Sequence, residues 1–228
     1  MSMQTALRTV STGHPQMNSA HRVVPTHSRF GAVELMGSQM KFAPNEEIFG
    51  ESEPADYVYK VTKGAVRTYK ILCDGRRQIG GFYLVGDIFG LEIGDTHQFS
   101  AEAINDATVM VIRRSAVVSL AERDCEVARE LWNCTGRELR RVQDHMMLLV
   151  KNAQQRVAGF LLEMSERLAT TDALKLPMSR QDIADYLGLT IETVSRTMTQ
   201  LASDHAIGLL SARQIVLRNR GALHQLNS

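Results

Sequence analysis

The spacing of apolar residues changes along the chain, from short runs typical of strands to the longer stripes of helices. Between residues 30 and 112 the apolar residues lie in brief runs separated by Gly, Pro, Asn and Asp. Such runs predict strands and such separators predict turns, with Asp74-Gly75 as a hairpin turn. The predicted strands are residues 40–42, 47–49, 57–61, 65–69, 78–79, 82–84 and 108–112. Many short strands at regular spacing predict a small antiparallel barrel or jelly roll.

A helical period replaces this pattern near residue 125. Steps of four and three residues then alternate through a stripe made of Ala128, Trp132, Thr135, Leu139, Val142, Met146, Leu149 and Ala153. The segment contains no proline and only Gly136 interrupts it, so we predict one helix over residues 125–151, about 39 Å long. A helix packed on its own domain would also carry an apolar stripe, but a seam sustained over three heptads favours a two-stranded dimer contact. The predicted dimer interface consists of Trp132, Thr135, Leu139, Val142, Met146 and Leu149.

Two short helices joined by a tight turn are predicted within residues 177–203. Ser179 and Thr190 stand at the two N-cap positions, and Asp182 can complete a capping box with Ser179. Gly188 ends the first helix, because glycine adopts the left-handed conformation without a Cβ penalty. The apolar faces are Ile183, Ala184 and Leu187 in the first helix and Val194, Met198 and Leu201 in the second. This arrangement predicts a helix-turn-helix.

The second of these helices has a polar outer face. At about 100° per residue, Glu192, Ser195, Arg196 and Thr199 lie opposite the apolar stripe, with Ile191 on the flank. Arg196 can pair with guanine O6 and N7, and Glu192 can accept a hydrogen bond from cytosine N4. A glutamate near a helix N-terminus is also favourable through the helix dipole alone. The capped pair of helices, more than any single side chain, therefore indicates DNA binding.

Two further elements flank the helix-turn-helix. Residues 154–168 have the period of one more helix, and residues 207–210 and 214–217 form a small hairpin, the wing, with Arg213 near its tip. The wing is either purely structural or a phosphate contact, and Arg218 and Arg220 lie close to it in sequence. The predicted contacts to the DNA backbone are Arg180, Thr190, Thr193, Thr199 and Arg213.

The composition indicates the cellular compartment of the protein more clearly than it indicates a binding partner. The chain has 228 residues, and its 26 Lys and Arg against 25 Asp and Glu leave a net charge of +1, so any basic DNA-binding surface must be local. No apolar run reaches the roughly 18 residues that a membrane helix needs, and the N-terminus lacks the apolar segment of a signal peptide. The three cysteines form no C-x-x-C pair, which favours free thiols in a reducing cytoplasm.

The chain resembles the Crp–Fnr family of bacterial transcription regulators over about residues 30–220. The resemblance is carried by E-x-I-F-x-E-x-E-P-A-D-Y-V-Y-x-V-x-x-G-x-V-R at residues 46–67, G-D-I-F-G at residues 86–90, the long helix, and I-A-D-Y-L-G-L-T-I-E-T-V-S-R at residues 183–196. It implies an α+β fold with an N-terminal antiparallel β-roll, a long dimerisation helix and a C-terminal winged helix-turn-helix. The implied regions are a sensor-like β-roll over 29–124, a dimerisation helix over 125–152 and a DNA-binding domain over 153–228. Residues 1–28 are rich in Ser, Thr, His, Gln and Pro and have no apolar period, so we expect a flexible tail there.

The same resemblance suggests which base pairs are read. The E-x-x-S-R signature, here Glu192, Ser195 and Arg196, is similar to that of the branch whose members read TTGAT-type half-sites in a palindrome. In that branch these three residues make the base contacts, and a residue at the position of Ile191 can touch a thymine methyl group. The predicted base contacts are Ile191, Glu192, Ser195 and Arg196.

The sensor part departs from the family's ligand-binding branches. Leu91 stands where the cyclic-nucleotide branch has a glutamate for the ribose, and Phe99-Ser100 replaces its Arg-Ser pair for the phosphate. Gly90 and Glu92 stand where the haem branch has its Cys and His. We therefore expect neither a cyclic nucleotide nor haem to bind.

An iron–sulfur cluster and a metal centre are not expected either. The oxygen-sensing branch carries clustered N-terminal cysteines, and residues 1–72 contain no cysteine. A cupin-like barrel enzyme, an alternative on this fold, would need clustered metal ligands, and His97 is the only histidine between residues 30 and 112. A second alternative is a cyclic-nucleotide-responsive module, against which Leu91 and Phe99 argue.

The remaining resemblance is to the FixK branch, whose members act without a recognised ligand downstream of oxygen-responsive systems. We expect a cytoplasmic, nucleoid-associated homodimer that binds a TTGAT-like palindrome and activates low-oxygen respiration or nitrogen-fixation genes together with RNA polymerase. Residues 74–77 form a charged turn that we interpret as solvated and not as a polymerase contact.

Overall fold

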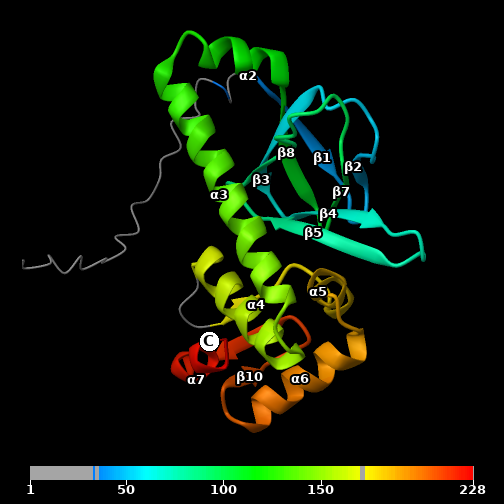
Figure 1. The fold of residues 1–228 in the computed structure, drawn as a ribbon, viewed down its shortest axis with the longest axis vertical. Helices are drawn as coiled ribbons and strands as arrows, with labels where there is room; N and C mark the ends of the chain where they lie inside the picture. The colour runs from blue at the N-terminus through cyan, green and yellow to red at the C-terminus, as the bar shows by residue number, and fades with distance from the viewer. Residues whose placement is uncertain (1–32, 34–35, 170–172, 228) are drawn as a thin grey trace, which may run out of the picture.

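A β-roll, a long helix and a small helical domain follow one another in the computed structural model (Figure 1). The structure describes residue 33, residues 36–169 and residues 173–227. The predicted tail over residues 1–28 lies outside the described residues. The α+β architecture predicted from the sequence is confirmed.

Two four-stranded antiparallel sheets form the β-roll. The first has the order β1 (Ser38–Phe42), β8 (Ala107–Arg113), β3 (Tyr57–Lys63) and β6 (Ile88–Phe89). The second has the order β2 (Glu47–Phe49), β7 (Ser100–Ala103), β4 (Val66–Ile71) and β5 (Arg77–Tyr83). Side chains of both sheets share one apolar core, which includes Val61, Val66, Phe89 and Val109. Burial of each such side chain contributes about 1.5–3 kcal/mol to folding.

The strand predictions differ from the structure in both sheets: in the first, the two-residue strand β6 was not predicted, and the second differs at two strands. Residues 78–79 and 82–84 were predicted as separate strands, whereas β5 is one strand through Gly80-Gly81, with a shift in its register against β4 at Gly80. A Cβ atom at Gly80 would lie 2.9 Å from the ring of Phe99, so this glycine permits close packing and does not mark a turn. Strand β7, Ser-Ala-Glu-Ala in sequence, was not predicted, since its small residues carry no β pattern and its pairing with β2 and β4 creates the strand.

The predicted long helix is α3 (Cys125–Leu149), which follows the unpredicted short helix α2 (Arg114–Ala121). Asp124 caps the start of α3 by accepting a hydrogen bond from the backbone N–H of Glu126. The helix ends at Leu149 because Asn152 begins the next helix, α4 (Ala153–Arg167), with a capping box that includes Gln155. Ala153 therefore belongs to α4, and the apolar stripe of α3 ends at Leu149.

The C-terminal domain contains the predicted helix-turn-helix and wing, with two additional elements. Its helices after α4 are α5 (Arg180–Leu187), α6 (Ile191–Ser203) and α7 (Arg220–Asn227), and its strands are β9 (Leu174–Lys175), β10 (Ile207–Leu209) and β11 (Gln214–Leu217). The wing hairpin is β10 with β11, and β9 adds a third strand beside β11. Neither β9, which is two residues long, nor α7 was predicted.

The apolar core of this domain continues into the β-roll. Phe82 of β5 packs against Phe160 of α4 and Tyr186 of α5, with ring centroids 6.2 and 5.1 Å apart. Figure 1 shows α5 between the β4–β5 hairpin and α6. The β-roll thus contacts the helix-turn-helix directly, in addition to the chain connection through α3.

Candidate nucleic-acid interface

Both N-caps and the turn of the helix-turn-helix have the predicted local geometry. The Ser179 hydroxyl accepts from the Asp182 N–H at 3.1 Å, and the Asp182 carboxylate accepts from the Ser179 N–H at 2.9 Å, which completes the capping box. Gly188 ends α5 in the left-handed region, with φ at 61°. Thr190 accepts from the Thr193 N–H at 3.2 Å and starts α6. Each cap contributes about 1 kcal/mol, so the angle between the two helices is locally determined.

We expect Gly188→Ala to destabilise the domain by about 1–2 kcal/mol, because a side chain in the left-handed conformation is strained. Thermal unfolding followed by circular dichroism measures this change. Gly94→Ala is the matched control, since Gly94 has no positive φ and an added Cβ there would only touch the Thr96 carbonyl oxygen at 3.9 Å, an ordinary van der Waals contact. A Gly188→Ala protein that melts with the wild type would contradict the assignment of strain to this turn.

The polar face predicted for α6 is exposed as a whole. Val194, Met198 and Leu201 have no exposed surface and anchor the helix in the domain core. The exposed residues of the opposite face are Ile191, Glu192, Ser195, Arg196 and Thr199. The helix lies at the end of the molecule away from the β-roll, so this face is accessible to a large partner (Figure 1). The structure therefore brings the four predicted base contacts together on one accessible helix.

Glu192 is ionised at a position where base recognition needs a hydrogen-bond acceptor. Hydrogen bonds from its own backbone N–H and from the Thr190 hydroxyl, together with the nearby Arg196 charge, lower the pKa of its carboxyl group. An ionised carboxylate only accepts hydrogen bonds, so it suits the amino group of cytosine. Glu192 and Arg196 then present one acceptor and one donor fork one helical turn apart.

The predicted backbone contacts surround this face. Arg180 donates through Nε to the Ala212 carbonyl at 3.3 Å, and Arg213 donates through Nη1 to the Pro177 carbonyl at 3.2 Å. These two bonds connect the wing to the start of α5. Burial lowers the pKa of Arg180, but a guanidinium stays protonated in proteins, and each side chain keeps further N–H donors. Their contact with phosphates stays a prediction, as it does for Thr190, Thr193 and Thr199.

The stripe on α3 is an exposed apolar surface in the single chain. Trp132 is 80% exposed, Leu139 57% and Met146 58%, and Val142 is exposed as well. Leu149 is half-buried, and the Thr135 hydroxyl donates to the Leu131 carbonyl at 3.0 Å. Isolated exposed apolar residues are ordinary, but a contiguous row of them along a helix marks an interaction surface. We call this row, residues 132–149 at heptad spacing, the α3 seam.

A cavity of about 460 Å³ lies between the β-roll and α3, where the family resemblance places an effector. Leu91 and Phe99, the two residues that depart from the cyclic-nucleotide branch, both line it. Its carboxylates are Glu92 and Glu138, and the described residues that line it include no lysine or arginine. A cyclic phosphate in this cavity would therefore lie near carboxylates and an aromatic ring, and not near a cation that could pair with its negative charge.

His145 also lines this cavity and is held in place on two sides. Its ring stacks on Tyr186 with centroids 3.8 Å apart, and its Nε2 lies 2.8 Å from the Tyr186 carbonyl. Burial lowers the pKa of His145, the charge of Arg141 lowers it further, and the hydrogen bond opposes both. The histidine is therefore neutral at pH 7 and offers no charge to an anion.

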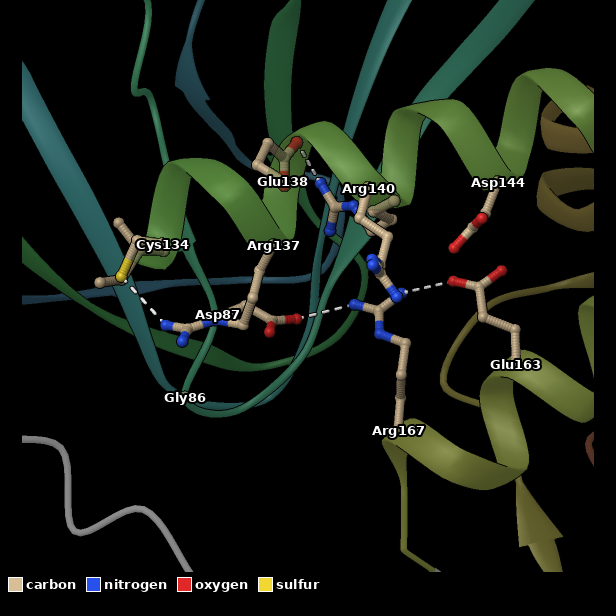
Figure 2. Close-up of a pocket in the computed structure, with 11 residues that line it drawn as sticks. Gly86, Asp87, Cys134, Arg137, Glu138, Arg140, Asp144, Glu163 and Arg167 are labelled. Atoms are coloured by element: carbon tan, nitrogen blue, oxygen red, sulfur yellow. Dashed lines mark hydrogen bonds and ion pairs between the residues drawn. The ribbon is translucent and has the colours of Figure 1, made fainter. Parts of the chain in front are cut away.

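A second cleft, of about 320 Å³, lies between α3, α4 and the loop before β6 (Figure 2). Arg167 points into it from α4 and donates to the Phe82 carbonyl at 2.6 Å, to Asp87 at 2.7 Å and to Glu163 at 3.1 Å. Arg141 of α3 donates to the same carbonyl at 3.0 Å. The charged groups of this cleft hold the C-terminal domain and α3 against the β-roll.

The interpretation of residues 74–77 as a solvated turn is wrong for its last residue. Arg77 opens β5 and points to α5, where its guanidinium pairs with Asp182 at 2.7 Å and with Asp185 at 2.8 Å. Burial alone would lower the pKa of Arg77, but the hydrogen bond to Asp185 and the two negative charges raise it overall. Arg77 and Asp185 are thus interdomain residues that sequence reasoning missed, because their partners are remote in sequence.

Within the described residues, no group of three or more His, Cys, Asp or Glu side chains is arranged to hold a metal ion. The helices of the described part are each too short or too polar to cross a bilayer.

Two family models match separate parts of the chain. One, described as a cyclic nucleotide-binding domain, matches residues 39–124, and the other, described as a Crp-like helix-turn-helix domain, matches residues 155–226. The two matched segments coincide with the β-roll and with the domain that contains α5, α6 and the wing.

Individual relatives match over most of their length. The chain is 48% identical over 202 residues to the nitrogen fixation regulation protein FixK of Azorhizobium caulinodans, covering 86% of this chain and 82% of that protein. It is 36% identical to the transcriptional activator protein anr of Pseudomonas aeruginosa, covering 73% of this chain and 70% of that protein. The solved structure of FixK2 from Bradyrhizobium japonicum superposes with a TM-score of 0.81 at 54% identity, covering 84% of this chain and 98% of that one.

Proposed function

Because this chain belongs to the Crp–Fnr family of transcription regulators and to its FixK-like members, we propose that it is a homodimer that binds a palindromic operator without a small-molecule effector. It is a DNA-binding regulator and not an enzyme. The observation that carries the proposal is the exposed polar face of α6, held at a fixed angle by two caps and the Gly188 turn.

The α3 seam supports the dimer. If the seams of two chains pair as a coiled coil, the two α6 helices are related by a two-fold axis. They then enter successive major grooves about 34 Å apart, which requires an inverted repeat. Glu192, Ser195 and Arg196 match the residues that read TTGAT-type half-sites, so TTGAT is the half-site we propose.

The chemistry of the cavity beside α3 supports independence from cyclic nucleotides. Its acidic and aromatic lining opposes a phosphate, and Leu91 cannot bond a ribose hydroxyl. The absence of cysteine from residues 1–72 argues against an iron–sulfur cluster, and the presence of Gly90 and Glu92 in the loop after β6 argues against haem.

The relatives suggest the genes under control. FixK of Azorhizobium caulinodans is named for nitrogen fixation, and anr of Pseudomonas aeruginosa is named as an activator. We propose that this chain activates genes of low-oxygen respiration or nitrogen fixation, at the nucleoid in the bacterial cytoplasm. Activation would require contact with RNA polymerase beside the operator.

Purified protein should bind a TTGAT palindrome with no ligand added. Fluorescence anisotropy with a labelled duplex measures the affinity, and a duplex with both half-sites scrambled is the control. Because phosphate contacts release counterions, affinity should fall as salt rises, with a log–log slope of about −0.9 per phosphate neutralised. Protein that binds this operator only after a small molecule is added would refute effector independence, and equal affinity for both duplexes would refute the operator.

A further inference from the structure

Two arginines of the β-roll extend to the first helix of the helix-turn-helix. Arg67 of β4 and Arg77 of β5 both donate to Asp182 Oδ1 on α5, at 3.0 and 2.7 Å. Arg77 also donates through Nε to Asp185 Oδ2 at 2.8 Å. We call these four residues the interdomain clamp.

The carboxylate of Asp182 has two structural roles, one through each of its oxygen atoms. Its Oδ2 atom accepts from the Ser179 N–H at 2.9 Å and from the Ser179 hydroxyl at 2.7 Å, which caps α5. Its Oδ1 atom accepts from the two arginines of the β-roll. The start of the helix-turn-helix is therefore bonded to the sheet at the same residue that fixes its own first turn.

The clamp is largely buried, and this argues for a role in geometry. The Asp182 side chain is 4% exposed and that of Arg67 is 8% exposed. Arg67 is held from the other side by Glu102 at 2.6 Å and by Asn45 at 2.8 Å. Buried ion pairs add little net stability, because desolvation opposes their attraction, but they define one arrangement and penalise others. An arginine fork fixed at both ends sets the position of α5 relative to the sheet.

Ring contacts and one hydrogen bond of Tyr186 hold the C-terminal end of α5. Tyr186 packs between the rings of Phe82 and His145. Its backbone carbonyl also accepts from Gln78 of β5 at 3.3 Å. Because α6 packs on α5, the position of α5 against the β-roll determines how the exposed polar face of α6 is oriented.

We propose that Arg77 and Asp185 are positioning residues for DNA recognition, which fix the orientation of α6 so that the dimer accepts only one half-site spacing. This inference rests on the proposed dimeric function. In place of an effector, the clamp holds the two domains in the DNA-binding arrangement. When the clamp is broken, the C-terminal domain with α5 and α6 can rotate about residues 150–152, which connect α3 to α4, and operators with altered spacing should become acceptable.

Arg77→Gln, Asp185→Asn and the double variant test this proposal, because they leave the Asp182 cap intact. Affinity is measured for the operator and for duplexes with the spacer one base pair shorter or longer. The wild type should prefer the unaltered spacing, and each single variant should reduce that preference about fivefold or more. The double variant should resemble Arg77→Gln, because that single change already removes the pair with Asp185 as well as the pair with Asp182. Arg77→Lys, which keeps the charge but not the fork, should fall between the wild type and Arg77→Gln.

Arg76→Gln is the matched control on the same hairpin. Arg76 is 77% exposed and pairs with Asp74, so its removal should change neither spacing preference nor melting temperature. If Arg77→Gln and Asp185→Asn lower the melting temperature but keep the wild-type spacing preference, or if their effects on that preference add, the positioning role is refuted. Failure of the wild type to bind the palindrome without ligand would instead refute the proposed function.

Discussion

Arg196→Ala is expected to abolish most sequence discrimination by the dimer. One bidentate contact to guanine is worth about 1–3 kcal/mol, and each operator contains two symmetric half-sites. Distant sites add, so the full palindrome should lose about 2–6 kcal/mol, or at least about thirtyfold in affinity. Competition binding with operators changed at one base pair at a time measures both the loss and the position that is no longer read.

A matched variant separates the effect of the guanidinium's hydrogen-bond geometry from the effect of its positive charge. Arg196→Lys keeps the positive charge but cannot form two parallel hydrogen bonds to one base, so it should recover nonspecific affinity without full discrimination. Arg196 is exposed on α6 and its removal leaves no cavity, so the melting temperature should stay unchanged. An Arg196→Ala protein that still discriminates at full strength would show that the base contacts are made elsewhere.

The recognition helix could be predicted from sequence because the signals for it are local. Thr190 caps a helix that begins at the next residue, and Val194, Met198 and Leu201 follow within three turns. The exposed face follows from that period without knowledge of the rest of the fold. The same holds for α3, where the predicted helix and its stripe depend on heptad spacing alone.

The interdomain clamp could not be predicted because its partners are remote. Arg77 and Asp182 are 105 positions apart, and Arg67 and Asp182 are 115 apart. An arginine beside a hairpin turn has the local pattern of a solvated residue, and only the packing of α5 on β5 changes its surroundings. Strand β7 was missed for the same reason, since Ala101 and Ala103 become strand residues through pairing with β4.

Leu139→Arg is expected to separate the dimer and, with it, to remove tight binding to the palindromic operator. Leu139 is 57% exposed in the single chain, so its burial depends on a partner seam. Because only the exposed part of each Leu139 is newly buried, each copy contributes about 1–2 kcal/mol and the two copies together about 2–3 kcal/mol. Loss of both weakens the dimer by about one to two powers of ten, before the repulsion between two facing arginines is counted. Sedimentation velocity over a concentration series measures this change.

Asn133→Arg adds the same charge to the same helix, off the seam, and is the control. Asn133 is exposed and lies more than a quarter turn away from the Leu139 stripe at about 100° per residue, so its variant should stay dimeric and bind DNA. A Leu139→Arg monomer still contains an intact α6, so it should keep weak binding to a single half-site. This residual binding distinguishes a variant that has lost only the dimer contact from one in which the DNA-binding domain is misfolded. A Leu139→Arg protein that remains a dimer would show that the chains associate through another surface, and the spacing of the operator would then have a different origin.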